Sequence, residues 1–210
     1  MKRTWIHSSV LAAVIGLSAA PGHAADAGGL PEDFVRRCHE LAQLALAGTE
    51  PLATCVVVGS TLTVVGQSLS IPAYCRVRAV VRPAIRVEVR LPVDAAWNGR
   101  YFQSGCGGLC GDVLSDYPHL FNSSLPGQAR GYATATSDTG HWGANTDGRW
   151  AYANPQAEED FAYRSIGATA TLAKALIGHF YAPKASVPSI FAGCSTGGRL
   201  AVKAALKYPT

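Results

Sequence analysis

The amino-acid sequence predicts an α/β fold, and within that class the leading half of a sheet whose parallel strands are joined by helices. Apolar residues alternate between residues 75 and 91, and they recur at helical spacing between 158 and 180. A serine flanked by glycines then separates a short apolar run from a second helical segment. Strands and helices that alternate along a chain are typical of a sheet with crossover helices.

The first strong signal is a β-hairpin. From Cys75 to Leu91 the apolar residues alternate with a period of two on both sides of Pro83, which predicts two antiparallel strands. Three further features follow in order: a turn at Asn98-Gly99, a short strand at 100–103 that enters the glycine-rich segment 105–111, and a strand at 132–136.

The sequence of the second half of the chain predicts a helix, a strand, a turn and a second helix. Helical spacing of apolar residues, with acidic residues in the first turn, indicates a helix over about 158–180. The apolar run 187–192 predicts a buried strand. Residues 193–198 then turn the chain, and 200–206 continue it as a helix.

The N-terminus has the pattern of a secretory signal peptide. Lys2 and Arg3 precede an apolar run at 10–17, and the small residues that follow end in Gly22-His23-Ala24. The apolar run is far shorter than the roughly 20 residues that a helix needs to span a bilayer. We therefore expect cleavage after Ala24, a secreted or periplasmic protein, and no membrane association after cleavage.

The charge and cysteine content of the chain limit the kinds of partner and metal ion that we expect it to bind. The formal net charge is +4, of which Lys2 and Arg3 supply two, and no later cluster of basic residues follows, so we expect no nucleic-acid partner. In an oxidising compartment the cysteines are expected to form disulfides. Cys106 and Cys110 do not form a C-x-x-C pair and no histidine pair at ligand spacing accompanies them, so we expect no metal site.

The sequence Gly193-Cys194-Ser195-Thr196-Gly197 matches the G-x-S-x-G pattern of a nucleophile elbow. In such an elbow a strained turn between a strand and a helix projects the serine hydroxyl above the sheet. The alternative is an ordinary N-cap serine, which does not explain glycines on both sides. We therefore predict Ser195 as the nucleophile of an α/β-hydrolase sheet.

An acyl-transfer serine also needs backbone N–H donors for the oxyanion. Thr196, directly after the serine, supplies one. Gly107 and Gly108 are candidates for the second, because a glycine-rich loop can bring its backbone close to a substrate. The alternative for this segment is a plain turn held by Cys106 or Cys110.

The catalytic acid and base are missing from the expected place. In α/β-hydrolases the order along the chain is Ser, then Asp or Glu, then His, but every histidine and every acidic residue here precedes Ser195. Asp138 and His141 could pair with Ser195, but their spacing matches no template, and we expect His141 to be structural or substrate-lining. We therefore expect an N-terminal fragment that is inactive alone.

Several segments together resemble the tannase and feruloyl esterase family, which includes the hydrolases of mono(hydroxyethyl) terephthalate. The segments are residues 37–41, 71–77, 97–102, 135–141 and 191–199. The most specific element is the Cys194-Ser195 pair, because in that family the cysteine before the nucleophile is bridged to a cysteine directly after the catalytic histidine. The resemblance implies that the partner of Cys194 would lie beyond Thr210.

The resemblance also implies the remaining site and disulfide assignments. It implies that the amides of Gly108 and Thr196 form the oxyanion hole. The implied disulfides are Cys38 with Cys75 and Cys55 with Cys106, and Cys110 is left without a partner.

By resemblance the substrates would be esters of aromatic acids such as gallate, ferulate or other hydroxycinnamates. The family's lid, often with a structural calcium, is absent from this sequence, so we expect no cofactor here. We expect three segments: a signal peptide at 1–24, an N-terminal disulfide-stapled extension at 25–70, and a partial catalytic domain at 71–210 that stops before the lid and the C-terminal strands. The rival hypothesis is a non-catalytic secreted binding or structural module that retains the elbow turn.

Overall fold

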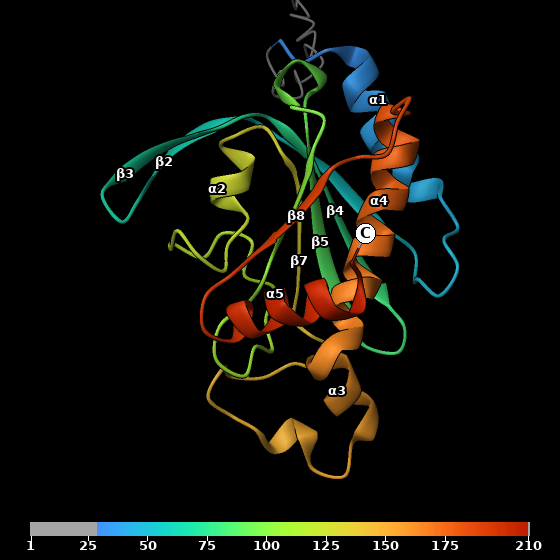
Figure 1. The fold of residues 1–210 in the computed structure, drawn as a ribbon. Helices are drawn as coiled ribbons and strands as arrows, with labels where there is room; N and C mark the ends of the chain where they lie inside the picture. Colours follow the sequence, from blue (N-terminus) through green and yellow to red (C-terminus); the bar gives the residue numbers. More distant parts are fainter. Residues whose placement is uncertain (1–28, 210) are drawn as a thin grey trace, which may run out of the picture.

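The fold is a mixed sheet with helices on both faces (Figure 1). The structure is a computed structural model that describes residues 29–209, so the expected signal peptide lies outside the described residues. The main sheet has six strands in the order β1-β4-β5-β7-β6-β8. Their bounds are β1 Ala53–Val57, β4 Tyr74–Val81, β5 Ile85–Pro92, β6 Tyr101–Ser104, β7 Ala133–Ser137 and β8 Ser189–Ala192.

The sheet changes from antiparallel to parallel along its width. β1, β4, β5 and β7 pair antiparallel, whereas β6 pairs parallel with both β7 and β8. The predicted hairpin is present as β4 and β5, with Val77 opposite Val89. The predicted strands at 100–103 and 132–136 are present as β6 and β7. These results confirm the α/β class.

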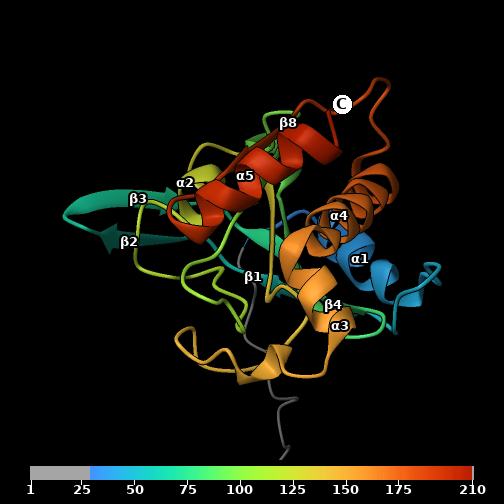
Figure 2. The same cartoon turned by 60° about the horizontal axis from the view of Figure 1, so that its bottom comes forward.

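A separate two-stranded sheet was not predicted. It consists of β2 (Ser60–Val64) and β3 (Gln67–Ile71), paired antiparallel. In both ribbon views it extends from the main body on the side opposite α4 (Figure 2). Val64, beside the turn of this ribbon, and Ile71, at its other end, are buried in one cluster with Tyr74 and Leu125, and this small cluster anchors the ribbon to the molecule.

The helices lie on the two faces of the main sheet. Their bounds are α1 Glu32–Glu40, α2 Leu125–Gln128, α3 Pro155–Glu159, α4 Ser165–Tyr181 and α5 Thr196–Lys207, with a π-helical turn at Asp160–Arg164 and 3-10 turns at Leu41–Gln43, Asp94–Ala96 and Arg149–Ala151. The predicted helix at 158–180 corresponds to α3, the π-helical turn and α4 together. Within residues 29–209 no helix has the length and apolar character needed to cross a membrane.

The main core lies between the sheet and the helices α1 and α4. The alternate residues of the hairpin that face this side, among them Val77 and Val89, are fully buried. They pack in one cluster with Leu176 of α4, and Phe34 of α1 meets Phe180 edge to face, with ring centroids 5.6 Å apart. Burial of this continuous apolar surface is the main force that holds the helices on the sheet.

The opposite face of the hairpin is charged, and it is organised around Arg90. This side chain is 2% exposed and lies 2.7 Å from Glu88 and 2.7 Å from Asp116, with a further hydrogen bond of 2.9 Å to Gln128. Its guanidinium also lies over the ring of Tyr74, 5.0 Å from the centroid. Arg90 therefore ties the loop between β6 and α2 to the sheet, and its hydrogen bonds lower the pKa of Asp116.

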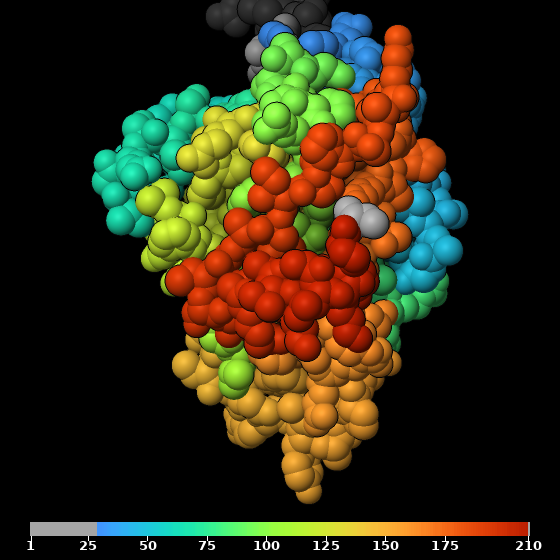
Figure 3. All heavy atoms as spheres, viewed as in Figure 1, coloured from blue at the N-terminus to red at the C-terminus, as the bar shows by residue number. Residues whose placement is uncertain are grey.

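β8 departs from its predicted burial. The strand is present at Ser189–Ala192, but it is the last strand in the sheet order and pairs only with β6. Ile190 is 44% exposed, so the prediction of a buried strand was wrong. Burial of a strand depends on neighbours on both sides, which a local apolar run does not report. Figure 3 shows the following helix, α5, in red at the surface of this face.

One of the two implied disulfides is present and one is wrong. Cys38 of α1 bonds to Cys75 of β4, with 5.5 Å between their Cα atoms. Cys106 bonds to Cys110 rather than to Cys55, and Cys55 is free. Cys55 lies on β1 with three strands between it and β6, a separation of roughly 19 Å at normal strand spacing. A disulfide needs Cα atoms within about 7 Å.

The Cys38–Cys75 bond is predicted to contribute substantially to stability. It joins residues 37 positions apart, and chain-entropy arguments give about 4 kcal/mol for a loop of that length. The variant with both residues changed to alanine should lose about that much free energy of unfolding in non-reducing urea titrations. Cys55→Ala is the control and should stay within about 1 kcal/mol of wild type, because Cys55 is unpaired and half-buried. Equal unfolding midpoints for the two variants would contradict this.

Candidate active site

Ser195 lies in a strained turn between β8 and α5. Its backbone has φ 55 and ψ −120, a left-handed φ that is uncommon for residues other than glycine. An N-cap serine would accept a hydrogen bond from an N–H in the first turn of the helix, but the Ser195 side chain makes no capping bond. The geometry therefore fits the strand-turn-helix elbow and not the N-cap alternative.

Three glycines allow the backbones around this turn to meet. A Cβ atom on Gly105, directly after β6, would lie 2.5 Å from the Cα of Gly197. A Cβ on Gly193 would lie 2.7 Å from the same atom. These separations are far below normal van der Waals contact, so the end of β6, the end of β8 and the start of α5 can converge only without side chains here.

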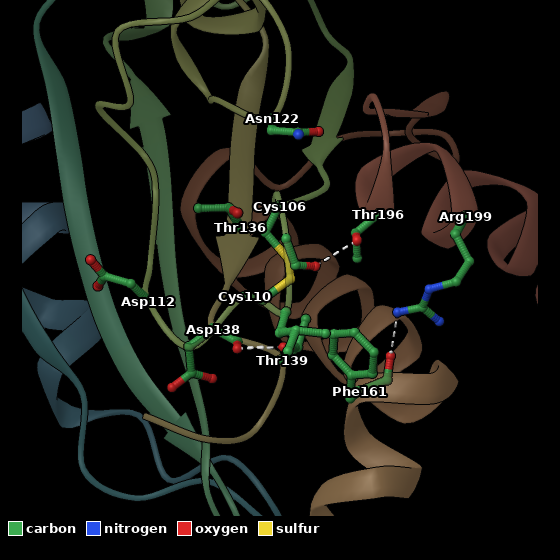
Figure 4. Close-up of a disulfide and its surroundings, with 12 residues drawn as sticks. Cys106, Cys110, Asp112, Asn122, Thr136, Asp138, Thr139, Phe161, Thr196 and Arg199 are labelled. Atoms are coloured by element: carbon green, nitrogen blue, oxygen red, sulfur yellow. Dashed lines mark hydrogen bonds between the residues drawn. A yellow bond between two sulfur atoms is a disulfide. The ribbon is translucent and has the colours of Figure 1, made fainter. Parts of the chain in front are cut away.

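The loop after β6 lies against the elbow (Figure 4). The Cys106–Cys110 disulfide closes this loop, and both cysteines are buried. Between them Gly108 has φ +56, and a Cβ there would lie 2.4 Å from the carbonyl oxygen of Asn145. The Thr196 hydroxyl donates a hydrogen bond of 2.5 Å to the Gly108 carbonyl. The two residues predicted as oxyanion donors are thus in direct contact.

The backbone N–H groups of these two residues lie next to the Ser195 turn. Within the described part of the chain, neither the Gly108 N–H nor the Thr196 N–H donates to another protein group. Thr196 is the first residue of α5, where the aligned peptide dipoles favour negative charge. The plain-turn alternative for the glycine-rich segment is also partly realised, because Cys106 and Cys110 hold the turn that presents Gly108.

Asp138 and His141 are structural rather than partners of Ser195. The fully buried Asp138 carboxylate accepts hydrogen bonds from the Arg86 Nε at 2.7 Å and the Gly140 N–H at 2.8 Å, and burial raises its pKa. The His141 Nε2 lies 2.9 Å from the Leu109 carbonyl oxygen, and its ring stacks on Trp150.

Burial lowers the pKa of His141, which favours the neutral ring with Nε2–H donating to that carbonyl. The expectation was that His141 is structural or substrate-lining, and this contact agrees with a structural role, since His141 supports the loop that carries Gly108. Across residues 29–209 no histidine hydrogen-bonds to Ser195, and no cluster of His, Cys, Asp or Glu is placed to hold a metal ion. Cys194 is a free, exposed thiol, and its pairing stays a prediction.

Asn122 is the site residue that the sequence did not reveal. It lies in the loop between β6 and α2 and hydrogen-bonds to both backbone groups of Cys194, the residue before Ser195. Its only local signal is its residue type, since asparagine tolerates the left-handed φ of 54 found here. No periodicity or motif marks a residue that acts across 72 positions of sequence.

A strained serine turn at the carboxyl end of a parallel strand, followed directly by a helix, defines the α/β-hydrolase class of protein. Residues 63–210 match the family model described as tannase and feruloyl esterase. The chain belongs to the tannase and feruloyl esterase family.

Individual relatives agree with this family. The chain is 36% identical over 178 residues to an uncharacterised esterase of Xanthomonas campestris pv. campestris, a match that covers 82% of this chain and 30% of the relative. It is 32% identical over 188 residues to a probable feruloyl esterase B-2 of Aspergillus terreus, covering 84% of this chain and 34% of that protein. The chain thus spans about a third of the length of these relatives.

Solved structures share the fold. The crystal structure of feruloyl esterase B from Aspergillus oryzae superposes with a TM-score of 0.69 at 28% identity, covering 84% of this chain and 36% of that one. Tannin acyl hydrolase from Aspergillus niger gives a TM-score of 0.62 at 20% identity, over 82% of this chain and 34% of that one.

The close approach of the glycine backbones at the elbow predicts how alanine substitutions change stability. Gly105→Ala should destabilise the chain by about 1–3 kcal/mol, because its Cβ would meet backbone atoms of Gly197 that have no room to move. Gly178→Ala is the matched control: it is an exposed position in α4 with open space around it, and alanine there should stabilise by about 0.5–1 kcal/mol. Urea unfolding compares the two. If Gly105→Ala left the free energy of unfolding unchanged, the backbones of Gly105 and Gly197 would not be tightly packed.

Proposed function

We propose that this chain carries the nucleophile and the oxyanion donors of a carboxylic-ester hydrolase that acts on esters of aromatic acids. The observation that carries the proposal is the strained backbone of Ser195 beside two segments, at Gly108 and Thr196, whose N–H groups have no protein partner among residues 29–209. Membership of the tannase and feruloyl esterase family supports it. The names of the matched relatives, a probable feruloyl esterase B-2 and a feruloyl esterase B, support the substrate class.

In the proposed mechanism a histidine from outside the described residues accepts the proton of Ser195 as its Oγ attacks the ester carbonyl carbon. The carbonyl oxygen becomes an oxyanion that accepts hydrogen bonds from the N–H groups of Gly108 and Thr196. The histidinium then protonates the leaving alcohol, and an acyl-enzyme remains on Ser195. Water attacks this ester, the histidine takes its proton, and the acid is released from the regenerated serine.

The contacts of the donor loop support this role. An oxyanion hole is effective only when its donors are fixed before the charge develops. Gly108 is held by the Thr196 hydroxyl on its carbonyl and by the disulfide around it. Leu109 adds a hydrogen bond of 2.7 Å from its N–H to Asn145, and its own carbonyl is bound by His141.

We also propose that the protein acts outside the cytoplasm. The expected signal peptide at residues 1–24 would direct export. The two disulfides agree with an oxidising compartment, where such bonds persist.

A fluorophosphonate probe tests the nucleophile. The purified chain should gain the mass of the probe at Ser195, because the reagent mimics the tetrahedral intermediate and needs the same oxyanion donors. Labelling should vanish in Ser195→Ala and persist in Ser189→Ala, an exposed serine on β8 that serves as the control. The rate should rise with hydroxide concentration, since no described histidine contacts Ser195. Equal labelling of several exposed serines, or none, would favour a non-catalytic module.

Turnover by the 210-residue chain is a separate prediction. We expect no measurable hydrolysis of methyl ferulate or methyl gallate by the purified chain, because deacylation needs a general base beside Ser195 and no described histidine occupies that place. Product release is followed by chromatography, with the Ser195→Ala chain as the background. Hydrolysis above that background would show that the chain has its own base, and the assignment of the base to residues outside the described part would fall.

A further inference from the structure

We propose that Asn122 is a positioning residue that holds the two peptides leading into Ser195, and so fixes the direction of the serine hydroxyl. This inference rests on the proposed function for its catalytic consequence. Its structural part stands on two hydrogen bonds of opposite direction. The Asn122 Nδ2 donates to the Cys194 carbonyl oxygen at 3.0 Å, and the Cys194 N–H donates to the Asn122 Oδ1 at 2.8 Å.

These two bonds act on successive peptide groups. The Cys194 N–H belongs to the peptide that follows Gly193, and the Cys194 carbonyl belongs to the peptide that joins it to Ser195. With both groups held, neither peptide plane can rotate freely, and we call this pair of hydrogen bonds the clamp. The Cys194 carbonyl also accepts a hydrogen bond of 2.9 Å from the Gly197 N–H, so the same oxygen joins the clamp to the first turn of α5.

An amide side chain of this length meets the requirement. It offers a donor and an acceptor at one end, whereas a carboxylate only accepts and an aliphatic side chain does neither. Space is made for it, because a Cβ atom on Gly197 would lie 2.1 Å from the Asn122 Oδ1. A Cβ on Gly107 would lie 3.5 Å from the Asn122 Nδ2. The amide is therefore wedged between the elbow and the oxyanion loop.

Asn122 is itself held by the charged face of the sheet. The same loop carries Asp116, whose carboxylate pairs with the buried Arg90. The loop then closes on itself, because the Ser124 N–H donates to the Ser115 carbonyl at 3.2 Å. The position of the Asn122 amide is thus fixed from the sheet and not only by the elbow that it holds.

The clamp matters because the Ser195 backbone is strained. A left-handed φ at a non-glycine residue persists only when surrounding contacts impose it, and the cost of such a conformation is comparable to what a pair of hydrogen bonds contributes. Without Asn122 the turn could relax and move the hydroxyl. A displacement of about 1 Å in a reacting group can cost on the order of 100-fold in rate.

The test compares two asparagines with the same number of contacts. Asn122→Gly keeps the left-handed φ without strain and removes both bonds. Asn98→Gly is the control, since Asn98 also makes two side-chain bonds to backbone, to Arg130 and from Arg100, away from the elbow. Hydrogen exchange of the Cys194 amide and the rate of fluorophosphonate labelling at Ser195 are measured on the full chain.

In Asn122→Gly we expect the Cys194 amide to exchange at least about tenfold faster and Ser195 labelling to slow by about 10- to 100-fold. Asn98→Gly should change neither. Faster exchange with unchanged labelling would overturn the positioning role, and unchanged exchange would overturn the clamp itself. A wild-type chain that the probe does not label contradicts the proposed function, and the exchange comparison then decides the clamp alone.

A second variant guards against a change in fold. Asn122→Asp keeps the acceptor for the Cys194 N–H and loses the donor to the Cys194 carbonyl. The Cys194 amide should therefore stay protected while Ser195 labelling still falls. Two results would contradict the two-bond clamp. One is a Cys194 amide that exchanges as fast in Asn122→Asp as in Asn122→Gly, and the other is Ser195 labelling in Asn122→Asp at the wild-type rate.

Discussion

The site depends on a close approach of three backbones at Gly197. β6 and β8 run parallel, with Ser104 paired to Ala192, so the residues that follow them, Gly105 and Gly193, leave the sheet side by side. The Gly105 N–H donates to the Ala192 carbonyl at 2.9 Å and keeps them together past the end of the ladder. α5 begins directly above this point, so any Cβ here would push the serine turn away from the donor loop. The glycines therefore determine whether Ser195 and the loop of Gly108 can be adjacent.

This convergence creates strain, and several contacts offset it. The left-handed backbone of Ser195 costs on the order of 1–3 kcal/mol. Each neutral hydrogen bond returns about 1 kcal/mol, and the surrounding turn receives two from Asn122 and one from the Thr196 hydroxyl to Gly108. The support extends to the sheet through the ion pair between the buried Arg90 and Asp116, whose loss would free the loop that carries Asn122. A charged network on one face of the hairpin thus stabilises a turn at the end of a different strand.

The sequence predicted the features whose signals are local. The hairpin has a period of two, α4 has helical spacing, and the elbow has its glycines, so each could be identified without knowing its neighbours. Asn122, Arg90 and the Cys106–Cys110 pairing were not predicted, because their roles depend on groups that only the fold brings together. The exposure of β8 has the same cause: a short apolar run specifies a strand but not the number of strands beside it. α1, β1 and the β2–β3 ribbon are short. α1 and β1 are placed by the disulfide and strand pairing at Cys75, and the ribbon is placed by packing on Tyr74 and Leu125.

The proposed chemistry has two parts, the oxyanion site with its nucleophile and the base that activates Ser195, and only the first is held by contacts within the described chain. The proposed nucleophile and oxyanion donors lie in segments 106–110 and 194–197, which with Asn122 are joined by backbone, disulfide, hydroxyl and amide contacts within the described chain. Within the described chain the titratable groups that support these contacts are His141, whose lowered pKa keeps it neutral near pH 7, and Asp116, whose lowered pKa keeps it ionised on Arg90. The geometry of the donors should consequently be independent of pH around neutrality. Any pH dependence of acylation in this range would then report on the base that activates Ser195 and not on the oxyanion site.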